Sequence, residues 1–215
     1  MAEAGRKPRS TRRWAEWASL PLLLLLWQVA AMLVAHRLFP TPVVVFGELY
    51  DLAAHGSLIA DVTKTLGRAV LAFFAAMTMG VVIGGALGRF GWADGLFGNW
   101  ILIGLNIPAI VVAITCYIWL GLTEFALILA VVINKTPLVA VNMREGVRAL
   151  DHGLAELAKV YRVGFWRRVN KFIIPQLMPY VLTAARTGLS LIWKIVLVFE
   201  VLGSDGGVGF RIGIF

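Results

Sequence analysis

Three charged side chains lie in stretches that are otherwise apolar enough to cross a membrane. Lys135 stands near the middle of one stretch, and Lys194 and Glu200 stand in another. A charge at the centre of a bilayer costs roughly 2.5–3.5 kcal/mol on insertion scales, so each needs a partner or an aqueous path. Cations inside a membrane suit the passage of an anion. The alternative is a structural ion pair between helices, or a lysine that snorkels to the interface.

Helical geometry limits which of these charges can meet. Lys194 and Glu200 lie six residues apart, which places them about 240° apart around a helix, so they point to different faces. Lys135 and Glu200, in different stretches, are therefore the possible ion pair. Together with two asparagines in the apolar stretches, these charges are the predicted lining of a solute path: Asn106, Asn134, Lys135, Lys194 and Glu200.

The composition is that of an integral membrane protein. The chain has 215 residues, of which 60% are hydrophobic and 15% charged, and its mean hydropathy is +0.83. Soluble domains average about 45–50% apolar and about 25% charged residues, so a disordered chain, a fibre and an ordinary soluble enzyme are excluded. One cysteine and three widely separated histidines exclude an internal disulfide and a Cys-rich zinc site. We expect no metal and no cofactor.

Five apolar stretches predict an all-α bundle of about five transmembrane helices. Each is close to the 20 or so residues that a helix needs to cross the hydrocarbon core. The first is longer than the apolar core of a cleaved signal peptide, so we expect it to be retained. The five stretches are residues 18–35, 69–87, 100–120, 125–143 and 180–202.

The basic residues predict the orientation. Residues 1–13 and 144–171 together account for the whole formal charge of +8. The positive-inside rule places such segments in the cytoplasm, and it explains the charge better than nucleic-acid binding does. We therefore expect a basic cytoplasmic tail at 1–17 with the N-terminus inside, a membrane domain at 18–215, and a cytoplasmic loop at 144–171. The connection 39–68 then lies outside.

Two further patterns predict local structure. Within 39–68, Phe46, Leu49, Tyr50 and Ala53 recur at helical spacing, which indicates a short helix on the membrane interface. In the second stretch, Gly80, Gly84 and Gly88 form two overlapping GxxxG steps. Such steps let a second helix approach closely, although glycine is also simply commoner in membrane helices.

The loop 144–171 contains a short amphipathic helix. Its apolar residues Leu154, Leu157, Ala158 and Tyr161 share one side, and Glu156 lies on the other. Such a helix either rests on the membrane interface or inserts into a groove of a soluble partner.

The sequence of this loop resembles a known motif. Residues 154–175, LAELAKVYRVGFWRRVNKFIIP, look like the EAA loop of ABC-importer permeases, with Glu156 at the acidic position and Ala158 at the second alanine. Leu157 replaces the first alanine of that motif. Arg162 stands where its glycine belongs, with Gly164 two residues later. The positions that the resemblance assigns to ATPase coupling are Leu154, Glu156, Leu157, Ala158, Tyr161, Gly164, Trp166 and Pro175.

The resemblance extends over about residues 39–210. It is closest to the nitrate, sulfonate and taurine group of binding-protein-dependent permeases. The segments that carry it, in chain order, are FPTPVVVF at 39–46, TLGR at 65–68, IPA at 107–109, WLGL at 119–122, the positions Pro137, Asn142 and Gly146, and Glu200 followed by GVGF at 207–210.

Such a permease implies a set of partners and a place in the cell. It would span a bacterial cytoplasmic membrane several times and form a path for a small, anionic solute with a second permease copy. Cytoplasmic ABC ATPase subunits, an external or periplasmic solute-binding protein and membrane lipid would be its partners. The resemblance also implies a non-catalytic subunit, with ATP hydrolysis in the partner subunit; the sequence accordingly has no G-x-x-x-x-G-K-[ST] motif. A sixth span, which the resemblance also implies, is absent from these 215 residues, and a shortened form is one interpretation.

Two other functional classes are alternatives to this one. A secondary transporter or channel subunit would use the intramembrane charges directly, and an inverted repeat would be expected, which the five stretches do not show. An intramembrane enzyme would need a nucleophile and a base at equal depth, but the histidines lie outside the spans and Ser190 has no base near it.

Overall fold

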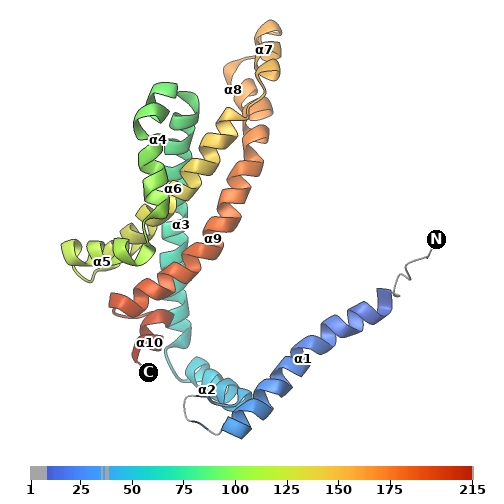
Figure 1. The fold of residues 1–215 in the computed structure, drawn as a ribbon, viewed down its shortest axis with the longest axis vertical. Helices are drawn as coiled ribbons and strands as arrows, with labels where there is room; N and C mark the ends of the chain where they lie inside the picture. Colours follow the sequence, from blue (N-terminus) through green and yellow to red (C-terminus); the bar gives the residue numbers. More distant parts are fainter. Residues whose placement is uncertain (1–8, 35, 37–38, 215) are drawn as a thin grey trace. The chain divides into compact units, whose positions relative to one another are not determined.

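The computed structural model describes residues 9–34, 36 and 39–214 (Figure 1). Most of these residues are in helices, and none of them is in a strand. The predicted all-α class is confirmed. The chain divides into two compact units, residues 1–59 and 60–215, which are described separately. The first eight residues of the predicted basic tail lie outside the described residues.

The first unit contains two helices, α1 (Arg9–Val34) and α2 (Pro42–Ala54). The apolar part of α1 is Ala18–Val34. α2 begins at the Thr41-Pro42 step because Thr41 Oγ1 accepts the Val44 N–H at 3.5 Å, while proline suits the first turn, where an N–H has no helical partner. The helix predicted around Phe46 is therefore α2.

Three long helices dominate the second unit: α3 (Leu58–Arg89), α6 (Glu124–Arg148) and α9 (Ile174–Gly203). They are long and apolar enough to cross a membrane, and α4 with α5 brings the number to four if that bent pair is one span. The predicted count of five stays a prediction. The remaining helices are α4 (Gly91–Asn106), α5 (Ala109–Leu120), α7 (His152–Val160), α8 (Phe165–Arg168), the π-helical η1 (Val169–Ile173) and α10 (Val208–Ile214).

The third predicted span, 100–120, is not one helix. α4 ends at Asn106, α5 starts at Ala109, and the two are bent by 97°. Pro108 causes the break, because it has no N–H to donate and restricts the residue before it to extended conformations; Ile107 has ψ 124°. The predicted span is therefore interrupted at Asn106 and Pro108, and the bent pair α4 and α5 takes its place.

The second predicted span starts earlier than expected. The apolar stretch begins at Ala69, but α3 begins at Leu58 and so includes Lys64 and Arg68, which the sequence had placed in the outside connection. Both side chains are paired with carboxylates, and this pairing lowers the free-energy cost of placing the two charges in a membrane helix.

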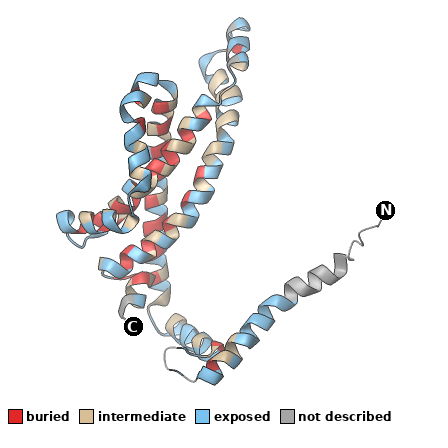
Figure 2. Ribbon diagram, viewed as in Figure 1, coloured by how far each residue is buried: buried red, intermediate tan, exposed pale blue. Residues whose placement is uncertain are grey.

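α6 lies at the centre of the second unit. Figure 2 shows buried residues concentrated along it and along the helices beside it. Its close contact with α3 depends on glycine: a Cβ added at Gly80 would lie 2.4 Å from Val139 Cβ, and one at Gly84 would lie 2.2 Å from the Ala140 carbonyl oxygen. The close approach predicted from the GxxxG steps is confirmed.

Candidate functional site

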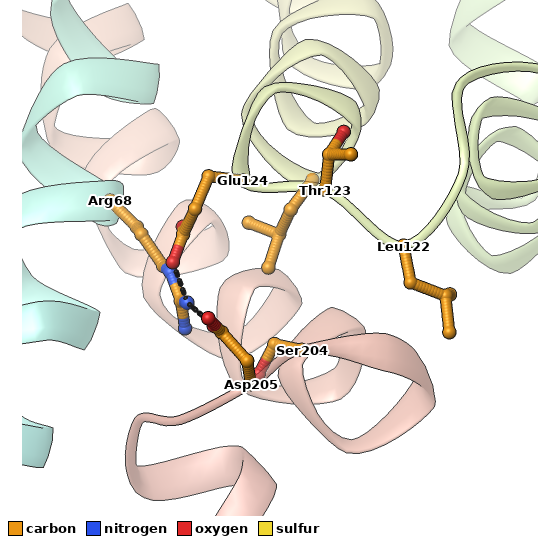
Figure 3. Close-up of a pocket in the computed structure, with 7 residues that line it drawn as sticks. Arg68, Leu122, Thr123, Glu124, Ser204 and Asp205 are labelled. Atoms are coloured by element: carbon orange, nitrogen blue, oxygen red, sulfur yellow. Dashed lines mark hydrogen bonds and ion pairs between the residues drawn. The ribbon is translucent and has the colours of Figure 1, made fainter.

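A cluster of charged residues joins three helices at one end of the second unit. Arg68 of α3 is 3% exposed. Its Nη1 donates to Glu200 Oε1 of α9 and to the Gly206 carbonyl, both at 2.6 Å, and its Nε donates to Glu124 Oε2 of α6 at 2.6 Å. Asp205 lies 3.4 Å from Nη2 (Figure 3). One guanidinium therefore ties α3, α6, α9 and the turn after α9 together.

Glu200 is fully buried and has a complete set of hydrogen bonds. The Thr65 hydroxyl lies 2.9 Å from both carboxylate oxygens, and the Gly209 N–H donates at 2.9 Å. The turn that presents this N–H needs glycine. Gly207 has φ +106°, and a Cβ on Gly209 would lie 2.2 Å from the Leu197 carbonyl oxygen. Gly207 and Gly209 thus allow the chain to close over the Glu200 carboxylate.

A small cavity of about 130 Å³ adjoins this cluster, between Arg68, the start of α6 and the turn at Ser204 and Asp205 (Figure 3). Lys64 Nζ lies 2.8 Å from Asp205 Oδ1 and 3.2 Å from Glu124 Oε1. The hydrogen bond from Lys64 lowers the pKa of Asp205 and keeps that exposed carboxylate ionised. With two cations and three carboxylates, the cluster does not favour a bound anion, and it acts as a structural tie.

The pair predicted between Lys135 and Glu200 is wrong. Glu200 is bonded to Arg68, 132 positions away in the chain. The prediction that Lys194 and Glu200 point to different faces of one helix is confirmed, because Lys194 is exposed and Glu200 is buried. Sequence reasoning missed Arg68 and Thr65. Their three-residue spacing, which places both on one face of α3, was the available signal.

Two of the predicted path residues stabilise the break between α4 and α5. Asn106 Nδ2 donates to the Leu102 carbonyl at 2.8 Å, and Asn134 Nδ2 of α6 donates to the Ile107 carbonyl at 3.3 Å. The bond from Asn134 satisfies the Ile107 carbonyl, which lies in the break between the two helices. The bond from Asn106 adds a side-chain donor to the Leu102 carbonyl near the end of α4. Lys135 is half-buried, and in the described part of the chain it has no ion-pair partner. Within the described residues, no hydrogen bond joins two of the five predicted path residues to each other.

A second charged cluster lies where α4 and α6 meet, at the opposite end of α6. Arg144 Nη1 lies 3.1 Å from Asp94 Oδ1, and Arg148 also pairs with Asp94. Glu145 lies 3.0 Å from Arg144. The described residues contain no group of three or more His, Cys, Asp and Glu side chains that could hold a metal.

The predicted coupling residues lie on α7, on α8 and in the turn between them, except Pro175, which lies in the first turn of α9 (Figure 1). Their apolar stripe is not one continuous face. Ala158 is 2% exposed and packs inward, and Leu154 is half-buried. The other predicted coupling residues are exposed: Glu156, Leu157, Tyr161, Gly164, Trp166 and Pro175.

Arg162 ends α7 in a left-handed conformation, with φ +50°. The Val163 N–H donates to the Ala158 carbonyl at 2.9 Å, and the Tyr161 N–H donates to the Leu157 carbonyl at 3.0 Å. The bond from Val163 is the long one of a Schellman motif, which usually has glycine at the left-handed residue. Position 162 is where the resembled motif has its glycine, and the arginine costs about 1–2 kcal/mol there.

Comparison with known proteins decides the family. Residues 76–214 match the family model described as "Binding-protein-dependent transport system inner membrane component". The chain belongs to this family. The matched region contains α4 to α9 and so includes the bent helix pair, the loop helices and Glu200.

Several curated permeases are similar to this one over most of its length. The putative aliphatic sulfonates transport permease SsuC of Bacillus subtilis is 30% identical over 98% of this chain and 78% of its own. The taurine transport system permease TauC of Escherichia coli is 26% identical over 89% and 72%. The nitrate import permease NrtB of Synechococcus elongatus is 21% identical over 90% and 73%.

The fold of this permease also matches a solved structure. A chain of the MetNI methionine ABC transporter in an inward-facing conformation superposes with a TM-score of 0.60 at 19% identity, over 71% of this chain and 77% of that one. Family and helices together make the protein an ABC transporter permease that crosses the cytoplasmic membrane several times.

Proposed function

We propose that this permease is the membrane-spanning subunit of an ATP-driven importer for a small anion such as a sulfonate, taurine or nitrate. The names of its relatives support the solute class. In this proposal the permease itself is non-catalytic, and separate cytoplasmic subunits hydrolyse ATP. An external solute-binding protein delivers the anion, and a second permease copy completes the path.

The observation that carries the proposal is a set of exposed apolar side chains in the loop region. Large exposed apolar groups at an aqueous end of a protein indicate an interaction surface. Phe165 and Trp166 also stack edge to face, with ring centroids 5.7 Å apart, so they offer a preformed surface. The coupling surface consists of Leu157 (48% exposed), Val160 (77%), Tyr161 (74%), Phe165 (71%) and Trp166 (76%).

We place this coupling surface in the cytoplasm, on the same side as the N-terminus. The basic residues of 144–171 support this orientation through the positive-inside rule. The Arg68–Glu200 cluster then lies toward the outside. Exposed apolar side chains between the two ends, such as Leu71 (62%), Phe74 (64%) and Val82 (66%) of α3, would face lipid.

The predicted path residues take different parts in the proposal. Lys194 is exposed and Lys135 half-buried, so both are available to a solute. Asn106 and Asn134 hold the bend between α4 and α5, which would border the path. Glu200 is fully buried and positions α9 through Arg68, so it would act on the path only by fixing that helix.

Changing Tyr161 to aspartate should remove the ATPase. The side chain is 74% exposed in the free permease, so a charge there leaves the fold intact, but binding of a partner would bury that charge without a counter-ion. The tagged full chain, purified from the cells that make it, should carry an ATPase with a G-x-x-x-x-G-K-[ST] motif, identified by mass spectrometry. We expect the variant to retain at most about one tenth of the ATPase that the wild-type chain retains. This corresponds to a loss of about 1.4 kcal/mol or more of binding free energy.

The matched control is Asn170→Asp, which adds one negative charge to an exposed position of η1 in the same loop. It should retain the ATPase. Equal recovery of ATPase with Tyr161→Asp and Asn170→Asp would show that the coupling surface does not bind it.

A further inference from the structure

α9 has a polar face that runs along the membrane-crossing part of the helix. At 100° per residue, Thr183, Arg186, Thr187, Ser190 and Lys194 fall within an arc of about 100°. All five are exposed. The buried residues of the same helix, from Ala184 to Phe199, centre on the opposite side. The helix therefore packs with one face and presents hydroxyls and two cations with the other.

The two cations lie deep in the helix. Arg186 and Lys194 are eight residues apart, about 12 Å along the axis, and Lys194 lies nine residues from the end of the helix at Gly203. Within the described residues neither has an ion pair. A face with two cations and three hydroxyls is costly against lipid, and a carboxylate or water would remove that cost.

In the described membrane-crossing helices of a second copy, every carboxylate is already paired with a cation. The carboxylate of α9 itself, Glu200, is fully buried and bonded to Arg68. Glu124, Asp94 and Glu145 pair with cations at the two ends of α6. Across a two-fold axis the polar face of α9 would meet the same cations, and like charges repel in a dry contact.

We propose that the polar face of α9 is a water-lined track that draws small anions through the membrane, with Arg186 and Lys194 as successive counter-ions and Ser190 between them. Solute oxygens accept hydrogen bonds from the two cations and from the Ser190 and Thr187 hydroxyls, which have no bond to another side chain in the described structure. The Thr183 hydroxyl donates to the Pro179 carbonyl at 2.8 Å and so offers only its oxygen. This inference rests on the proposed function for the identity of the anion as a transported solute.

The test uses cysteine labelling of the full chain in membrane vesicles. The Ser190→Cys variant is treated either with 2-sulfonatoethyl methanethiosulfonate, which is an anion, or with its trimethylammonium analogue, which is a cation. In each case the thiolate displaces methanesulfinate and forms a disulfide with the rest of the reagent. The native Cys116 is buried, so labelling of the wild-type chain measures the background reaction. We expect Ser190→Cys to favour the anionic reagent by about tenfold, relative to the same two reagents acting on a free thiol in solution.

The matched control is Leu189→Cys, at the same depth and about 100° round the helix, on an exposed apolar position. It should not react, because a thiolate does not form in lipid. Adding Arg186→Gln and Lys194→Gln to Ser190→Cys should abolish the anion preference. Thr187→Cys serves as a second probe of the track if Ser190→Cys accumulates poorly.

Two results would overturn the inference. If Ser190→Cys and Thr187→Cys are as unreactive as Leu189→Cys, the face is dry and the track does not exist. If they react without preference for the anion, the face is wet but its cations do not select solutes. Because labelling needs no ATPase, either result leaves the co-purification test of the proposed function standing on its own.

Discussion

Replacing Glu200 by leucine should make the helical bundle unfold at a markedly lower temperature than the wild-type chain. The change removes the carboxylate that accepts a hydrogen bond from Nη1 of Arg68, whose side chain is 3% exposed. It also removes the acceptor of the Thr65 hydroxyl and of the Gly209 N–H. Removing one partner of a buried ion pair costs about 3–5 kcal/mol when the remaining charge is left alone. Glu124 still pairs with Arg68 in this variant, so we expect the lower end of that range. The largest single effect on stability is expected here.

The chain supplies its own reporter for this measurement. Cys116 is 7% exposed, and it is the one cysteine of the sequence. A dye that fluoresces on reaction with thiols should therefore report unfolding of the detergent-solubilised protein as the temperature rises.

A double variant separates loss of a charge partner from loss of packing. Arg68→Met combined with Glu200→Leu removes both charges, while Glu124 keeps Lys64 at 3.2 Å and is 44% exposed, so no buried charge is left alone. We expect this double variant to be more stable than Glu200→Leu. If its loss of stability equals the sum of the losses in the two single variants, the account of a buried ion pair is wrong.

Replacing Gly84 by valine should also destabilise the bundle strongly, by about 3 kcal/mol. A Cβ there would lie 2.2 Å from the Ala140 carbonyl oxygen and 2.8 Å from the Ala140 Cα. Both are backbone atoms of α6, which cannot turn away as a side chain can, so α3 and α6 must separate. The same thermal assay on Cys116 measures the effect.

The neighbouring glycine is the matched control. A Cβ on Gly85 meets nothing within 4 Å. Gly85→Val should therefore be close to neutral, because valine is a better helix former than glycine and meets no neighbour there. Equal destabilisation by Gly84→Val and Gly85→Val would show that the glycines do not act through contact with α6.

Local patterns in the sequence predicted some features of the structure well. The repeat of Gly80, Gly84 and Gly88 predicted a close helix contact because the spacing puts all three on one face. The periodic apolar residues from Leu154 to Tyr161 likewise predicted α7. In both cases the information lies within a few turns of one helix.

Other features depend on contacts between distant segments. Arg68 and Glu200 are 132 positions apart, and helical periodicity gives the face of a residue but not the helix that it meets. The burial of Ala158 is similar, because the periodicity of α7 does not show which segment covers it. The break at Pro108 had a local signal in Asn106 and Pro108 themselves, whereas the 97° bend between α4 and α5 was not predicted.

The measurement that tests the central claim most directly is solute uptake. The permease, reconstituted into vesicles with the ATPase that co-purifies with it and with its solute-binding protein, should take up a radiolabelled alkanesulfonate, taurine or nitrate only when ATP is supplied on the ATPase side. Uptake of the same anion by the permease alone, driven by an ion gradient and unchanged by ATP, would contradict the account and identify a secondary transporter.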